Sequence, residues 1–143
     1  MLIAQLLKGK GDLVFTISPD ETLAVAAAQL VERRVGALVV LGAGDQVVGI
    51  LSERDLVRLM AERGAAALQA PVSDCMTAEV IFADPSETVD ALLGRMTDRR
   101  IRHLPVCRDT RLIGIVSIGD LVKRKIAEAE EEAEGLKAYI AAS

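Results

Sequence analysis

Two short stretches of the chain place a serine and an aspartate three residues apart, behind a glycine and two branched aliphatic residues. Residues 49–55 have the sequence GILSERD, and residues 114–120 have the sequence GIVSIGD. The aliphatic residues are typical of a short buried strand, and a serine followed by polar residues is typical of a helix N-cap. Each copy is therefore predicted to be a strand that turns directly into a helix.

A strand that turns into a helix offers chemistry suited to a nucleotide. The first N–H groups of a helix are unpaired and carry a partial positive charge, so they attract phosphate or another anion. The carboxylates of Asp55 and Asp120 would add acceptors for the hydroxyls of a ribose. A simpler interpretation is a capping box, in which the serine and the acid satisfy backbone donors and no ligand is involved. A single copy leaves both interpretations open.

The sequence surrounding these stretches is an internal duplication. The matched pairs are Pro19 and Pro85, Thr22 and Thr88, and Arg34 and Arg100 at an offset of 66 residues, then Ser52 and Ser117, and Asp55 and Asp120 at an offset of 65. A pattern this dense indicates a tandem repeat. Neither half is large enough to bury a core alone, so we expect the two repeats to pack together with pseudo-twofold symmetry.

Hydrophobic periodicity predicts the order strand, helix, strand, strand, helix in each repeat, which is an α/β (α+β) fold. For the first repeat we expect strands at 13–17, 35–41 and 47–51 and helices at about 18–34 and 52–63. The apolar face of the first of these helices is predicted to consist of Leu23, Ala26, Ala27, Leu30 and Val31. Residues 1–7 are expected to form a turn or two of helix, followed by a flexible basic loop at 8–11.

These elements divide the chain into four segments. The expected segments are a first repeat with its lead-in at 1–63, a linker at 64–71, a second repeat at 72–126 and an acidic helical tail at 127–143. The tail is rich in alanine and glutamate, which is typical of an exposed helix with charge pairs. Its apolar residues, such as Leu136, are candidates for contact with a neighbouring subunit.

Composition limits the partners and the location of the protein. The chain has 143 residues, 51% of them hydrophobic, and a net charge of −4, with only Phe15, Phe82 and Tyr139 as aromatic residues. Nucleic-acid binders need a basic surface and stacking platforms, so nucleic acid is not an expected partner. The apolar runs are far shorter than the roughly 18 residues of a membrane span, and no signal peptide is evident, so a cytoplasmic location is expected.

The repeat order and the G-x-x-S-x-x-D phrase resemble a tandem pair of cystathionine-β-synthase (CBS) domains. The phrases GALVVL, GILSERDLVR, MTDRRIRHLPV and GIVSIGDLV resemble the stand-alone bacterial and organellar CBS-pair proteins. The resemblance implies a Bateman module, in which two repeats form two clefts that hold an adenine nucleotide such as AMP, ATP, NAD or NADH. It also implies a homodimer of two modules in a four-repeat disc. No catalytic cofactor is implied.

The resemblance further implies that each cleft is built crosswise, from the first strands of one repeat and the serine and aspartate of the other. The cleft that we call the Asp120 cleft would contain Thr16, Ile17, Val35, Gly36, Ala37, Ile115, Ser117, Gly119 and Asp120. The cleft that we call the Asp55 cleft would contain Ile81, Phe82, Ile101, Arg102, His103, Ile50, Ser52, Arg54 and Asp55.

The cations are shared unequally between the two clefts. The Asp55 cleft gathers Arg54, Arg102 and His103, whereas only Lys8 or Lys10 would compensate in the Asp120 cleft. Because charge-assisted bonds to phosphate are strong, the Asp55 cleft is expected to bind the nucleotide more tightly.

Three classes of function remain in view. The first is a nucleotide-sensing module that regulates a separate protein, which the sequence does not name. The second is a dimerisation scaffold with vestigial clefts. The third is an enzyme, for which Cys107 with His103, or Ser117 with His103 and Asp120, are the candidate groups. No third group is evident to orient a Cys–His pair, and the serine and aspartate already have a role at the cap, so no enzyme is expected. The two cysteines lack CxxC spacing and no metal site is expected.

Overall fold

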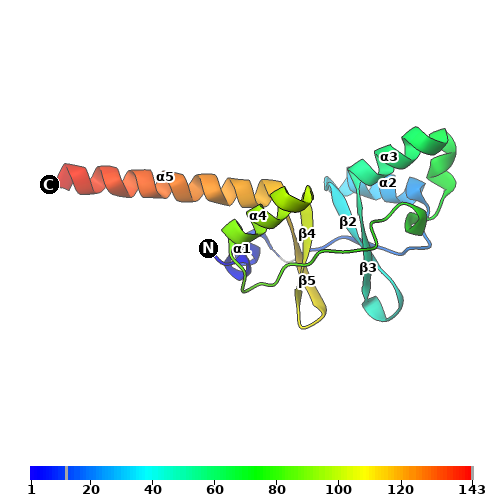
Figure 1. The fold of residues 1–143 in the computed structure, drawn as a ribbon, viewed down its shortest axis with the longest axis horizontal. Helices are drawn as coiled ribbons and strands as arrows, with labels where there is room; N and C mark the ends of the chain where they lie inside the picture. Colours follow the sequence, from blue (N-terminus) through cyan, green and yellow to red (C-terminus); the bar gives the residue numbers. More distant parts are fainter. Residues whose placement is uncertain (12, 143) are drawn as a thin grey trace.

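The structure is a computed structural model that describes residues 1–11 and 13–142. Two β-hairpins stand side by side with their turns at the same end, and helices cover the opposite end (Figure 1). The helices are α1 (Ile3–Lys10), α2 (Leu23–Arg33), α3 (Glu53–Arg63), α4 (Val89–Arg99) and α5 (Ile118–Ala142). The strands are β1 (Thr16–Ile17), β2 (Ala37–Leu41), β3 (Val47–Ser52), β4 (His103–Arg108) and β5 (Arg111–Ser117).

Each hairpin brings the serine of its repeat to the same place. β2 and β3 pair antiparallel with Ala37 opposite Ser52, and β4 and β5 pair antiparallel with His103 opposite Ser117. Both hairpins also shift register at the equivalent position, after Val40 in one and after Val106 in the other. The predicted mixed α/β fold of two repeats is therefore confirmed.

The first strand of each repeat is shorter than expected. β1 pairs parallel with β2 over Thr16 and Ile17 only, and in the second repeat the predicted strand around Ile81 and Phe82 is reduced to a bridge between Ala83 and Val106. The two repeats differ because Val39 donates its N–H to the carbonyl of Phe15, whereas its equivalent in the second repeat is a proline. Pro105 has no N–H to donate, so that rung of the ladder is lost.

The first helix of each repeat begins later than predicted. Thr22 and Thr88 are the N-caps of α2 and α4, and each hydroxyl accepts a hydrogen bond from the third amide of its helix. The residues from Ser18 form a turn ahead of the helix instead. Val31 was expected to face the core, but its side chain is 79% exposed, and Leu23, Ala26 and Leu30 are the buried positions of α2.

The basic segment near the N-terminus is helical rather than a loop. α1 continues through Lys8 and Lys10 and ends at Gly11, which has a positive φ of 97°. Lysines in the last turn complement the negative end of the helix, and a glycine just beyond it accommodates the positive φ without strain.

The short segments that precede the two repeats cross over. Ile3, Leu6 and Leu7 of α1 are buried in the core of the second repeat, and Val72 and Cys75 are buried in the core of the first. Backbone bonds fix both crossings, from Ile3 N to the Glu87 carbonyl at 2.9 Å and from Val72 N to the Glu21 carbonyl at 2.8 Å. Each core is therefore completed by a segment that precedes the other repeat.

The glycine of each repeated phrase makes room for this crossing. A Cβ on Gly49 would lie 2.6 Å from the sulfur of Met76, and a Cβ on Gly114 would lie 2.8 Å from a methyl group of Leu7. Such distances are shorter than packed atoms allow, so any other residue would push the crossing segment outward.

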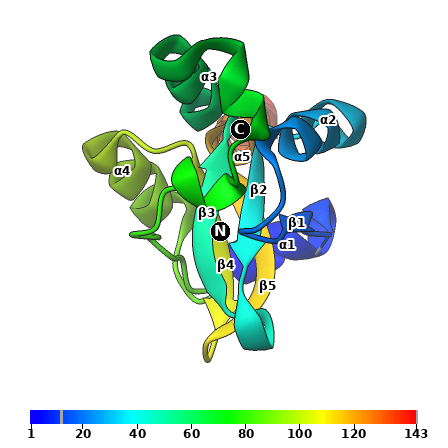
Figure 2. The ribbon, with the colours of Figure 1, turned by 90° about the vertical axis from the view of Figure 1, so that its right-hand side faces the viewer.

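The last helix is long and continues past the globular body (Figure 1). Leu121 in its first turns is fully buried, and every residue from Ala129 to Ala142 is exposed. The end-on view in Figure 2 shows helices above the hairpins and on both sides of them, and α5 runs along the viewing direction. Within residues 1–11 and 13–142, no helix has the length and apolar character needed to cross a membrane.

Candidate functional site

The serine and aspartate of each repeated phrase form a capping box. Ser52 accepts a hydrogen bond from the Asp55 amide at 3.2 Å, and the Asp55 carboxylate accepts from the Ser52 amide at 3.1 Å and its hydroxyl at 3.0 Å. In the second repeat, the Ser117 amide donates to the Asp120 carboxylate at 2.8 Å, and the Asp120 amide donates to Ser117 at 3.1 Å. The structural interpretation of the motif is thus realised in both copies.

The first amide of each helix also has a hydrogen-bond partner. The Glu53 N–H donates to the carbonyl of Gly36 at 3.0 Å, and the Ile118 N–H donates to the carbonyl of Arg102 at 2.8 Å. These bonds tie the start of each helix to the start of the neighbouring strand. Most of the expected phosphate-binding amides are therefore already paired, and charged side chains have to provide most of the attraction for an anion.

A cavity of about 380 Å³ opens between the two repeats. Its volume falls within the roughly 300–1,000 Å³ typical of small-molecule pockets. It is lined by these residues predicted for the Asp55 cleft: Ile50, Ser52, Arg54, Asp55, Ile81, Ile101, Arg102 and His103. Phe82 was predicted with them, but it does not line the cavity and is 41% exposed. Gly36, which was predicted for the Asp120 cleft, lines this cavity instead.

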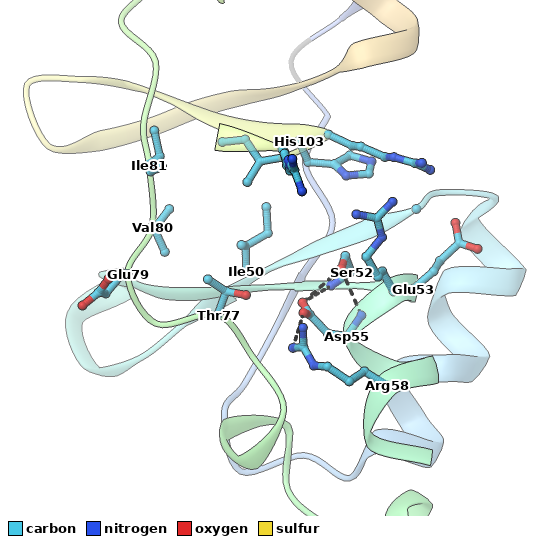
Figure 3. Close-up of a pocket in the computed structure, with 15 residues that line it drawn as sticks. Ile50, Ser52, Glu53, Asp55, Arg58, Thr77, Glu79, Val80, Ile81 and His103 are labelled. Carbon is cyan, nitrogen blue, oxygen red and sulfur yellow. Dashed lines mark hydrogen bonds and ion pairs between the residues drawn. The ribbon is translucent and has the colours of Figure 1, made fainter. Parts of the chain in front are cut away.

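Apolar side chains face the motif across this cavity. Figure 3 shows Val80 and Ile81 on an extended segment, with Ile50 on the strand opposite and the Ser52–Asp55 capping box below. The extended segment is held to β3 by hydrogen bonds between Ile50 and Thr77, at 3.0 Å and 2.9 Å. The cavity therefore has two apolar walls and a polar end, which suits a flat aromatic ring joined to hydrophilic groups.

The polar end of the cavity contains more cations than the sequence motif indicated. Arg58 lines it in addition to Arg54 and Arg102, and its guanidinium bonds the carboxylate of Asp55 at 2.8 Å. Arg100 also lines it, whereas Glu53 and Glu79 add negative charge. Arg58 is one helical turn after Asp55 on α3, so its spacing of three residues was a signal that the sequence already contained.

His103 lies between the two predicted clefts. Its ring is so close to Gly36 that a Cβ there would lie 3.1 Å from Nε2, and β4 places it opposite Ser117. Burial lowers the pKa of His103 below its ordinary value, and the nearby charge of Lys10 acts in the same direction, although Asp120 and Glu53 oppose them. The imidazole is therefore neutral at pH 7 in the free protein.

In the predicted Asp120 cleft, a lysine from α1 sits on the aspartate. Lys10 Nζ donates to the Asp120 carboxylate and to the carbonyl of Ile115, both at 2.6 Å. Burial alone would raise the pKa of Asp120, but the hydrogen bonds from Lys10 and Ser117 outweigh it, and the pKa is below its ordinary value. The carboxylate predicted to bind a ribose is thus already paired with a cation.

The other predicted residues of the Asp120 cleft differ in exposure and do not line one common cavity. Ile17 and Ala37 are buried, Thr16 and Gly119 are exposed, and the remaining ones are half-buried. Val35 lines a separate groove of about 440 Å³ between α2 and α3. The structure therefore gathers the Asp55 set around an open cavity and places Lys10 over Asp120 in the other set.

The cysteine suggested for nucleophilic chemistry is not activated. Burial raises the pKa of the Cys107 thiol, so the thiol is protonated at pH 7. Cys107 lies opposite Leu112 on the hairpin, whereas His103 lies opposite Ser117. This arrangement supplies no thiolate for attack.

With two repeats of the same architecture and a cavity between them, the chain is a tandem-repeat α/β protein. It belongs to the CBS domain family, whose model matches residues 12–62 and 72–127. No catalytic family is identified in these comparisons, and CBS-pair proteins are generally regulatory.

Several relatives share this architecture. The chain is 38% identical to the mitochondrial CBS domain-containing protein CBSX3 of Arabidopsis thaliana, over 96% of this chain and 71% of that protein. The crystal structure of the CBS-domain containing protein ATU1752 from Agrobacterium tumefaciens has a TM-score of 0.85 and 44% identity, over 87% of this chain and 92% of the other.

A more distant CBS domain pair, from protein MJ0100, was solved in complex with 5'-methylthioadenosine and S-adenosyl-L-methionine. It has a TM-score of 0.80 and 23% identity, over 90% of this chain and 98% of that one. The likeness at this identity is one of fold.

Proposed function

We propose that this protein is a regulatory module that senses an adenine nucleotide, such as AMP, ATP or NAD(H), and modulates a partner protein. The nucleotide binds in the Asp55 cleft. The observation that carries the proposal is the cavity between the repeats, which joins apolar walls to a cluster of arginines around Asp55. The adenosyl ligands of the MJ0100 domain pair, which shares the fold, support the chemical class.

Each part of the nucleotide has a counterpart in the cavity. The adenine ring packs between Ile50 and Ile81, because both are half-buried aliphatic residues on opposite walls. The ribose hydroxyls bond the carboxylate of Asp55, which is 6% exposed. The phosphates bond Arg54 and Arg102, whose guanidinium groups suit phosphate oxygens.

The ligand must change one contact that the free protein makes. Arg58 bonds Asp55 at 2.8 Å, but its side chain is 60% exposed and is free to swing toward a phosphate. A nucleotide that binds both the Asp55 carboxylate and the Arg58 guanidinium replaces this ion pair with two contacts to the ligand. Binding therefore reorganises the start of α3, which is a physical route from occupancy to a change in the surface.

Besides the regulated protein, a second copy of the chain is a proposed partner. The groove between α2 and α3 has a volume of about 440 Å³ and is bordered by Val31 and Val57, which are 79% and 66% exposed. Apolar side chains exposed together on two adjacent helices favour association. We propose on this basis that copies of the chain associate, with the groove as one candidate surface.

The scaffold function is the second candidate. It is favoured by the capping boxes, which give Ser52 and Asp55 a structural role without any ligand, and by Lys10, which pairs with the second aspartate. In that case the clefts bind no nucleotide and only the association of copies remains.

Calorimetric titration of AMP and NAD into the protein distinguishes the two functions. Arg102→Ala is expected to weaken binding by about 1.5–3 kcal/mol, because one charge-assisted bond to phosphate is lost. Arg99→Ala is the matched control, since Arg99 is exposed on the same turn of the chain and does not line the cavity. No heat with any adenine nucleotide supports the scaffold, whereas equal affinity of the two variants means that Arg102 does not bind the phosphate.

A further inference from the structure

The second half of α5 extends away from the globular body and is exposed to solvent. Every residue from Ala129 to Ala142 is exposed, and Figure 1 shows this stretch extending away from the body. Isolated helices shorter than about 12–15 residues are marginal in water, and most helices in proteins are stabilised by packing of an apolar face. Gly135 lowers the helix propensity of this stretch further. A second surface is therefore needed to hold it.

An apolar seam runs along one side of α5. Its members, separated alternately by four and three residues, are Val122, Ile126, Ala129, Ala133 and Leu136. This spacing is the heptad pattern of a helix that packs lengthwise on another helix. Val122 and Ile126 lie on the body and are 43% and 55% exposed, and Leu136 on the projecting part is 61% exposed. The seam is thus accessible over both halves of the helix.

The charges beside this seam change sign from one half of the helix to the other. Lys123 and Lys125 flank it near the body, and Glu130 and Glu132 flank it on the projecting half. The ion pairs along α5 within the described residues join Arg124, Lys125, Lys137 and the N-terminal amine to acids of the same chain. Lys123 and Glu130 are exposed and remain available to another molecule.

We propose that α5 packs antiparallel against α5 of a second copy of this chain, so that each projecting half covers the seam of the other body. Ile126 lies opposite the partner's Ala129, and Val122 lies opposite the partner's Ala133. The next layer places the partner's Leu136 over Gly119, where an added Cβ would meet only the Ser117 hydroxyl, at 3.6 Å. Every layer therefore joins a larger side chain to a smaller one, which packs densely.

The same register matches the charges. In an antiparallel helix pair, a residue that flanks the seam faces the partner's residue at the same heptad position. Lys123 therefore faces the partner's Glu130, and Lys125 faces the partner's Glu132. A shift by one heptad toward the C-terminus would bring Glu130 against the partner's Glu130 and Glu132 against the partner's Glu132. Like charges destabilise such a contact, so this antiparallel register is selected over the shifted one.

Side-chain size separates this arrangement from a parallel one. A parallel pair would also match charges, since Lys125 would face the partner's Glu130. However, it would place Ala129 on the partner's Ala129 and Leu136 on the partner's Leu136. Narrow alanine layers between wide layers cannot all make contact along straight helices, so the parallel pair leaves gaps. The antiparallel pair fills them and covers Val122 and Ile126 as well.

Sedimentation equilibrium of the full chain and of charge-reversal variants tests the proposal. Lys123→Glu and Glu130→Lys are each expected to weaken the dimer roughly tenfold, because two attractive pairs become two repulsive ones. The double variant restores the affinity, because it exchanges the two partners of the same pair. Glu131→Lys is the control with the same change of charge on the face of α5 that points away from the seam, and it leaves the dimer unchanged.

Each alternative gives a different result. In a parallel pair Glu130→Lys faces the partner's Lys125, so the double variant stays weak and the antiparallel contact is refuted. A dimer that is insensitive to both single reversals refutes any contact through α5. A mass of 15.2 kDa at the highest soluble concentration refutes a pairing of copies altogether. Circular dichroism confirms that the variants remain folded.

Discussion

The ion pair between Lys10 and Asp120 gives a prediction whose size follows from the geometry. Lys10→Met keeps the length of the side chain but removes the bonds to the Asp120 carboxylate and the Ile115 carbonyl, both at 2.6 Å. The two side chains are 32% and 27% exposed. Exposed pairs contribute up to about 1 kcal/mol, and hydrogen bonds to charged groups about 1.5–3 kcal/mol. A loss of about 1.5 kcal/mol in the free energy of unfolding is therefore expected, or about 5 °C in melting temperature.

A double-mutant cycle isolates the pair from other effects of the substitution. Urea unfolding of Lys10→Met, Asp120→Asn and the double variant should give a coupling energy of about 1 kcal/mol at pH 7. The folded pKa of Asp120 is depressed. Its stabilising contribution is therefore present above the unfolded pKa of about 3.9 and is lost as the pH falls through the folded pKa.

Lys8, which lies on α1 like Lys10, provides the control for the Lys10→Met substitution. Lys8→Met removes an exposed ammonium group from α1 and is expected to change the free energy of unfolding by less than about 0.5 kcal/mol. A coupling below about 0.3 kcal/mol at pH 7, or one that persists unchanged in acid, would mean that the Lys10 contact does not stabilise the fold.

Two further predictions concern the residues between the clefts. Because burial depresses the folded pKa of His103, stability is expected to fall as the pH drops below about 6.5, and His103→Gln should flatten this slope in urea titrations; an unchanged slope would exclude His103 as its origin. Gly36→Val places its side chain at the positions of the Glu53 carboxylate and the His103 ring, since a Cβ alone would lie 2.9 Å and 3.1 Å from them. It should reduce nucleotide affinity at least about tenfold by filling the cavity, as measured by calorimetry, whereas an unchanged affinity would place the ligand elsewhere.

The sequence predicted the fold because its signals were local and repeated. Thr22 and Thr88, and Ser52 and Ser117, are caps in equivalent positions, and their helices follow from them. The shortened strand of the second repeat was missed because alternation of apolar residues does not count hydrogen-bond donors. Pro105 removes one donor, and comparison with Val39 at the same offset would have indicated the loss.

The site was harder to predict, because it depends on contacts between distant residues. The residues around Asp55 were placed together by the resemblance to a family, and Arg58 was missed although it lies one turn away on the same helix. Lys10 was expected near Asp120 as a cation for phosphate, whereas the structure has it bonded to the carboxylate itself. No local pattern indicates that choice, since it depends on the path of α1 across the second repeat.

The crossing of the two lead-in segments determines how the halves respond to force, cleavage and ligand. Ile3 and Leu7 hold α1 in the core of the second repeat, while Val72 and Cys75 close the core of the first. The two halves are thus interlocked, and they cannot separate without opening both hydrophobic cores. A protease cut within Gly64–Gln69 would leave one particle, and the two fragments would have to complement each other to fold. The proposed ligand would therefore change the tilt of the two halves and would not separate them while both cores stay closed.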